Sequence, residues 1–109
     1  MQKTLKKSLY FNGIGLHTGV VVTMKLYPAK VDYGIKFIRK DIKDNNVIEA
    51  LWSNVSSTKL STTISNQNGT SVSTVEHLMS ALSGLHIDNI KIEIDGPEVP
   101  IMDGSSIKF

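Results

Sequence analysis

One stretch of the chain, residues 73–85, predicts an amphipathic helix. Its sequence is STVEHLMSALSGL. Apolar side chains recur at intervals of three and four residues, which places them on one face of a helix that packs against a core. These side chains are Val75, Leu78, Met79, Leu82 and Leu85. The rest of the chain is arranged around this helix.

Both ends of the predicted helix carry recognisable signals. Ser73 and Glu76 stand in the S-x-x-E spacing of a capping box, in which each side chain satisfies a free backbone N–H at the helix start. Gly84 followed by Leu85 has the form of a glycine-terminated C-cap with a hydrophobic contact behind it. We therefore expect the helix to begin at the capping box and to end at Gly84.

Glu76 and His77 form a candidate site on this helix. They project from its first turn, away from the apolar face, and His77 shares its side with small residues that leave room for close approach. The alternative is structural, because an acidic side chain at this position also completes a capping box and suits the helix dipole. On that interpretation His77 is an ordinary surface residue, and the spacing alone leaves both interpretations open.

Alternating apolar residues predict strands before and after the helix. Ile90, Ile92 and Ile94 alternate with charged residues, and Asn68-Gly69 marks a hairpin turn within residues 66–69. The strands are expected at residues 4–12, 20–26, 35–39, 47–50 and 89–95, with β-prone residues at 62–64. The predicted fold class is α+β, a two-layer sandwich with a mostly antiparallel sheet and the helix packed on one face. Residues 1–109 are expected to form a single domain.

Composition excludes several classes of protein. Apolar residues make up 40% and charged residues 20%, which is typical of a globular chain. The net charge is +2 and the lysines are not interleaved with aromatic residues, so nucleic acid is not an expected partner. There is no cysteine, which means that a metal must be held by His, Asp or Glu. No apolar run reaches the roughly twenty residues of a transmembrane helix, and we expect a soluble cytoplasmic protein.

Four sequence blocks resemble a known family. They are GIGLHTG (residues 13–19), STVEHLMSALSGL (73–85), IDNI (87–90) and PEVPIMDGSS (97–106). In this order they resemble the N-terminal domain of the UDP-3-O-acyl-N-acetylglucosamine deacetylase family, the zinc hydrolases of lipid A biosynthesis in Gram-negative bacteria. The resemblance extends from the first predicted strand to the last residue.

The resemblance implies roles for individual residues. The family removes the N-acetyl group from UDP-3-O-acyl-N-acetylglucosamine, releasing acetate and a free amine. Glu76 is then the catalytic general base and His77 a ligand of Zn²⁺. The implied substrate contacts are Leu16, His17, Thr58 and Leu60, for which ordinary loop positions are the alternative. Asp103 is expected to stabilise the Asp-Gly turn of the last block.

The family has two domains, and its second domain supplies the remaining zinc ligands. We expect that C-terminal domain to be absent from this chain, so that the chain alone is inactive and needs it as a partner. One alternative is a non-catalytic binding or assembly domain that self-associates through its uncovered face. Another is a homodimer that assembles a metal site from two copies of His77 and other residues.

Overall fold

The computed structural model describes residues 1–58 and 61–100. Eight strands, one α-helix and one short 3₁₀-helix occur within those ranges. In chain order they are β1 (Leu9–Ile14), β2 (Val21–Pro28), β3 (Ile35–Arg39), β4 (Val47–Glu49), η1 (Trp52–Asn54), β5 (Val55–Ser57), β6 (Thr63–Ser65), β7 (Ser71–Ser73), α1 (Glu76–Gly84) and β8 (Ile90–Ile94).

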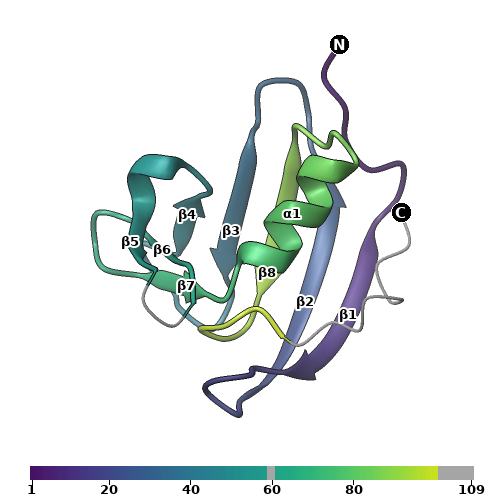
Figure 1. The fold of residues 1–109 in the computed structure, drawn as a ribbon. Coiled ribbons are helices and arrows are strands. Elements are labelled where there is room, and N and C mark those ends of the chain that lie inside the picture. Colours follow the sequence, from purple (N-terminus) through teal and green to yellow (C-terminus); the bar gives the residue numbers. More distant parts are fainter. Residues whose placement is uncertain (59–60, 101–109) are drawn as a thin grey trace.

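The main sheet has five strands in the order β1-β2-β8-β3-β4. Neighbouring strands are antiparallel except β3 and β8, which run parallel. The helix α1 crosses one face of this sheet, over β8 and β2 (Figure 1). These two layers confirm the predicted α+β class and the mostly antiparallel sheet.

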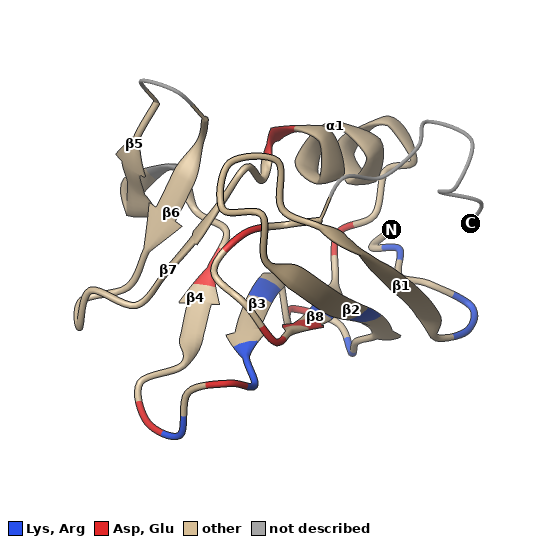
Figure 2. Cartoon of the chain, turned by 90° about the horizontal axis from the view of Figure 1, so that it is seen from below, with Lys and Arg blue, Asp and Glu red and all other residues tan. Residues whose placement is uncertain are grey.

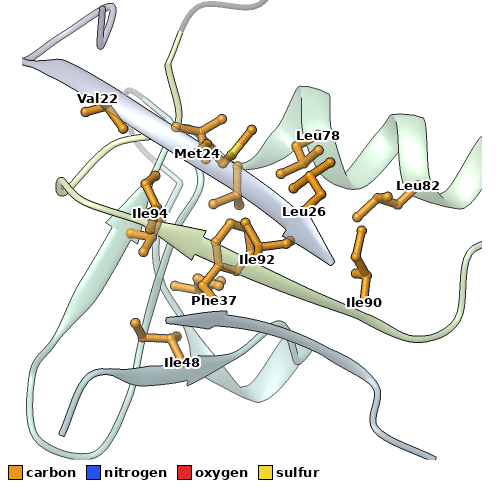
Figure 3. Packing of buried hydrophobic residues seen from close by; sticks show 14 of the residues in the cluster. Val22, Met24, Leu26, Phe37, Ile48, Leu78, Leu82, Ile90, Ile92 and Ile94 are labelled. Carbon is orange, nitrogen blue, oxygen red and sulfur yellow. The ribbon is translucent and has the colours of Figure 1, made fainter. Parts of the chain in front are cut away.

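The core lies between α1 and the main sheet. The alternation along β8 is confirmed, since Ile90, Ile92 and Ile94 are fully buried. Leu78 and Leu82 of α1 are fully buried against the strands, and Figure 3 shows the labelled side chains filling the space between the layers. Burying an aliphatic side chain of this size contributes roughly 1.5–3 kcal/mol. The apolar face of the helix therefore holds α1 in place above the sheet.

A second, three-stranded sheet of order β5-β6-β7 lies beside the main one. Its β6–β7 turn is the predicted hairpin, and the Asn66 side-chain carbonyl accepts hydrogen bonds from the N–H groups of Asn68 and Thr70. Gly69 has φ +82°, a conformation that glycine adopts without steric cost. From β7 the chain enters α1 after a short connection, so this small sheet adjoins the start of the helix (Figure 1).

The capping box at the start of α1 is not formed. Ser73 is the last residue of β7, and its hydroxyl donates to the Pro97 carbonyl. The N-cap is instead Val75, without a side-chain cap bond, and Glu76 accepts a hydrogen bond from Thr62. The prediction was wrong because strand pairing holds Ser73 in an extended conformation: it pairs with Thr63 and bridges to the segment after β8.

The other end of α1 also differs from the prediction. The helix ends at Gly84, but the left-handed residue is His86, with φ +57°. The His86 N–H donates to the Ser83 carbonyl and the Ile87 N–H to the Leu82 carbonyl, which together form a Schellman motif with His86 in the usual glycine position. Leu85, predicted to face the core, is 44% exposed because it lies beyond the last helical turn.

The first strand is shorter than predicted. It begins at Leu9, and Thr4 forms only an isolated bridge with Asn89. Val20 is 43% exposed and precedes β2. Where the chain is described, no helix is both long and apolar enough to cross a lipid bilayer.

Candidate functional site

Glu76 opens α1, next to the small sheet, and is the acidic residue at the helix start in Figure 2. Its Oε2 accepts a hydrogen bond of 2.9 Å from the backbone N–H of Thr62. Its Oε1 is buried and has no hydrogen-bond partner. A buried polar atom left without a partner costs about 1–3 kcal/mol. Such an atom needs a hydrogen-bond donor from outside the described residues, which a water, an ion or a ligand can supply.

The charge state of Glu76 suits a proton acceptor. Burial acts to raise the pKa of its carboxyl group. Hydrogen bonds from Thr62 and from the backbone N–H of Glu76, together with the electrostatic effect of His77, outweigh burial and hold the pKa below its ordinary value. The carboxylate is therefore ionised at neutral pH, and the unpartnered Oε1 is free to accept a proton.

A pocket of about 290 Å³ lies between the small sheet and α1. Apolar side chains form most of its wall, and Glu76 and Thr62 bring polar groups to it. The full lining is Ala50, Leu51, Val55, Thr62, Ile64, Val75, Glu76 and Met79. A mostly apolar hollow with a few polar groups is the usual form of a small-molecule site.

His77 is exposed, as an imidazole that binds an external group must be. No cluster of three or more His, Cys, Asp and Glu side chains able to hold a metal ion occurs among residues 1–58 and 61–100. A catalytic zinc site ordinarily needs three protein ligands. The described residues thus fit only part of such a site, in which His77 lies beside a carboxylate with an unpartnered oxygen.

Leu16 and His17 lie in the loop between β1 and β2, which we call the 15–19 loop. The Leu16 side chain is 63% exposed, and His17 is also exposed. The buried carboxylate of Glu98 stabilises this loop, because it accepts hydrogen bonds from the backbone N–H groups of His17 and Thr18. The side chains of Leu16 and His17 therefore remain available at the surface.

Glu98 was not singled out in the sequence, although among the described residues it is the one charged residue that is buried. Its side chain is fully buried, and besides the 15–19 loop it binds the hydroxyl of Thr74. Burial acts to raise the pKa of Glu98, but the bonds from Thr74, Thr18 and His17 hold it below its ordinary value. The available signal was a carboxylate placed among Pro97, Val99 and Pro100.

The remaining predicted contacts are only partly described. Thr58 is exposed just after β5, and Leu60 lies outside the described residues, as does Asp103. The structure brings Glu76 to Thr62, which is close in sequence to the candidates Thr58 and Leu60. It connects the 15–19 loop to Thr74, which is near Glu76 in sequence, through Glu98.

Comparison with known proteins bears on this arrangement. The sequence model of the family described as LpxC, UDP-3-O-acyl N-acetylglycosamine deacetylase, matches residues 2–109. The chain belongs to this deacetylase family. A UDP-3-O-acyl-N-acetylglucosamine deacetylase of Geobacter sp. (strain M21) is 55% identical over 108 residues, which cover 99% of this chain and 35% of that protein. The protein of the same name from Myxococcus xanthus (strain DK1622) is 50% identical over 108 residues, covering 99% and 34%.

The LpxC match covers residues 2–109 of this chain. It contains every described strand, α1 and the candidate residues from Leu16 to His77. The chain spans about 35% of the length of the Geobacter relative, so the matched region corresponds to only a part of an LpxC protein.

Proposed function

We propose that this chain is the N-terminal domain of a zinc-dependent hydrolase that deacetylates UDP-3-O-acyl-N-acetylglucosamine in lipid A biosynthesis. Membership of the LpxC family over residues 2–109 supports this reaction class. The observation that carries the proposal is the buried, unpartnered Oε1 of Glu76, immediately before an exposed His77.

Glu76 and His77 would divide the chemistry between them. Bound zinc supplies a water whose pKa is near neutrality. The ionised Glu76 would accept a proton from that water at Oε1, while the hydrogen bond from the Thr62 N–H keeps Oε2 fixed. His77 contributes one imidazole ligand, and the other ligands would come from a second domain. This division explains why adjacent residues at a helix start bear different functional groups.

The substrate contacts in this proposal are Leu16, His17, Thr58 and Leu60. The exposed positions of Leu16, His17 and Thr58 support it, because each is open to an incoming ligand. The domain acts only when joined to its C-terminal partner, in the cytoplasm.

The second candidate is a non-catalytic assembly domain of the same fold. It is favoured by the incomplete set of metal ligands within the described residues. In that case Glu76 has a local structural role through Thr62, and the uncovered face mediates self-association.

A chimera separates the two candidates. Residues 1–109 are joined to the segment of the Geobacter relative that follows its matched region, and acetate release from the UDP-linked substrate is measured with and without zinc. The proposal expects zinc-dependent release, abolished by Glu76→Ala and by His77→Ala. The matched controls are Glu93→Gln, whose half-buried carboxylate pairs with Lys91, and His86→Asn, which lies past the end of α1.

Unchanged activity in the Glu76 and His77 variants would remove both role assignments. A folded chimera with no activity at any zinc concentration, together with concentration-dependent dimers of the 109-residue chain, would support the assembly domain instead.

A further inference from the structure

We infer that Glu98 is a positioning residue that holds the 15–19 loop and the start of α1 in one fixed arrangement. The effect of Glu98 on catalysis rests on the proposed deacetylase function. The effect of Glu98 on the arrangement of the two segments does not depend on that function and can be measured separately.

The Glu98 carboxylate is shared between the two segments. Oε1 accepts N–H groups from His17 at 3.1 Å and Thr18 at 2.9 Å. Oε2 accepts the same His17 N–H at 3.1 Å and the Thr74 hydroxyl at 2.6 Å. Hydrogen bonds to an ionised acceptor are shorter and stronger than neutral ones. Neither segment can move relative to the other without breaking one of them.

The backbone of Glu98 is fixed from both sides as well. Ser73 bridges to Glu98 in a parallel sense, and Gly15 bridges to Pro100 in an antiparallel sense. The Ser73 N–H donates to the Pro97 carbonyl, and the Val99 N–H donates to the Ser73 carbonyl. The segment after β8 therefore runs between β7 and the 15–19 loop, with the Glu98 side chain held rigidly inside.

Thr74 depends on this contact. It has φ +60°, a left-handed conformation that β-branched residues rarely adopt. Residues held in such conformations persist only where their surroundings enforce them. The Thr74 hydroxyl bond to Glu98 acts here together with the backbone hydrogen bonds of Ser73 and Val75 on either side, and Glu76 lies two positions further along the chain. The direction in which α1 starts is thus set in part by Glu98.

Gly15 allows the 15–19 loop to lie close to the Glu98 carboxylate. A Cβ at this position would overlap Oε1 of Glu98 and the hydroxyl of Thr18. The 15–19 loop approaches the carboxylate this closely because residue 15 has no side chain. Leu16 and His17 follow directly, so the contact fixes the backbone that carries the two proposed substrate residues.

Replacing Glu98 by Gln removes the negative charge of the side chain and keeps its shape. The amide fits the same space and keeps a carbonyl for the loop N–H groups, but it cannot accept hydrogen bonds with both ends. Thr74→Val removes the hydroxyl and keeps the β-branched shape, whereas Thr74→Ser keeps the hydroxyl. Glu93→Gln, on the half-buried face of β8 that points away from α1, is the matched control for the loss of a carboxylate.

The first measurement is a ¹H–¹⁵N NMR spectrum of the 109-residue chain. In Glu98→Gln and Thr74→Val, the amide signals of His17 and of Glu76 should both shift and exchange faster with solvent. The amides of Ile92 and other core residues should stay unchanged. Thr74→Ser and Glu93→Gln should resemble the unmodified chain. Shifts at His17 alone, with α1 unaffected, would overturn the coupling.

The second measurement is kcat/KM of the chimera at a temperature where all variants are folded. Small misplacements of catalytic groups cost up to about 100-fold in rate, so Glu98→Gln should lower kcat/KM about 10- to 100-fold, mostly in kcat. Thr74→Val should follow it, and Thr74→Ser should restore activity. A folded Glu98→Gln chimera with unchanged kcat would show that the contact only stabilises the fold. If the unmodified chimera lacks activity, the proposed function fails and the NMR result alone decides the coupling.

Discussion

At the scale of single residues, Glu98 shows how a buried charge is accommodated without a cation. The ion pairs found in the described residues involve Asp41 and Glu93, not Glu98. Backbone N–H groups and one hydroxyl take the place of water around its carboxylate. Such hydrogen bonds favour the ionised form of a carboxyl group. The negative charge therefore belongs to the folded state and contributes to its stability.

Gly15→Ala should destabilise the chain. The added methyl group would overlap the Glu98 carboxylate and force the 15–19 loop away. Overpacking of this kind costs about 1–3 kcal/mol. The control is Gly84→Ala, where a Cβ meets nothing within 4 Å and should stabilise the helix by about 0.5 kcal/mol. Chemical denaturation measures both, and equal effects of the two substitutions would contradict the close contact at Gly15.

The stability of the chain should fall in acid, in part because of Glu98. Its folded-state pKa lies below the ordinary value of 4.5. Its contribution is therefore complete above pH 4.5 and is lost as the pH falls through the lowered folded pKa. Glu98→Gln should flatten this part of the dependence, while Glu76 and Asp41, whose pKa values are also lowered, maintain the rest. Denaturation curves at a series of acidic pH values test this, and an identical slope in the variant would refute it.

At the scale of elements, the two ends of α1 differ in how their free backbone groups are hydrogen-bonded. Val75 provides no side-chain cap, but the Schellman bonds at the other end satisfy the last carbonyls. The buried face formed by Leu78 and Leu82 provides the main stabilisation. Tertiary packing rather than local capping fixes this helix.

His86→Gly should stabilise the chain. A left-handed conformation costs a residue with a Cβ roughly 1–2 kcal/mol, and glycine avoids most of this cost. Because glycine also loses more freedom on folding, we expect a gain of about 1 kcal/mol. Ser83→Gly, inside the helix, should instead lower the stability by about 0.5 kcal/mol. Thermal unfolding of both variants provides the comparison, and a loss of stability in His86→Gly would argue against the Schellman assignment.

The elements were largely predictable, because alternation and helical periodicity are local signals. Ile90 to Ile94 and the residues of β3 were found where expected. Ser73 was misassigned because its strand partners Thr63 and Glu98 lie far away in sequence. Local spacing carries no information about such pairings. Ser73 therefore forms part of β7 and not a capping box.

At the scale of the whole molecule, the candidate site was only partly predictable. Glu76 and His77 stand out as a pair on one helix turn. The role of Thr62 as partner of Glu76, and of Glu98 as partner of His17, depends on contacts between distant segments. Leu16 and His17 are candidates only through the resemblance of their sequence block, and their substrate contacts stay a prediction; both residues are exposed.

The 109-residue chain should lose added zinc on dialysis. The described residues contain no cluster of three ligands, and a single imidazole such as His77 binds zinc only weakly. The chimera should retain it, and His77→Ala in the chimera should not. Elemental analysis after dialysis gives the zinc content. Retention of stoichiometric zinc by the chain itself would favour the homodimeric site over the two-domain one.

The position of β8 has a consequence for synthesis on the ribosome. This strand lies between β2 and β3 in the sheet, yet it follows them and α1 in the chain. Until Ile90–Ile94 emerges, the β1–β2 hairpin and the β3–β4 hairpin have no strand to join them. The edges of β2 and β3 that pair with β8 stay unpaired until that strand is made. The sheet closes only when its middle strand, made last, is inserted.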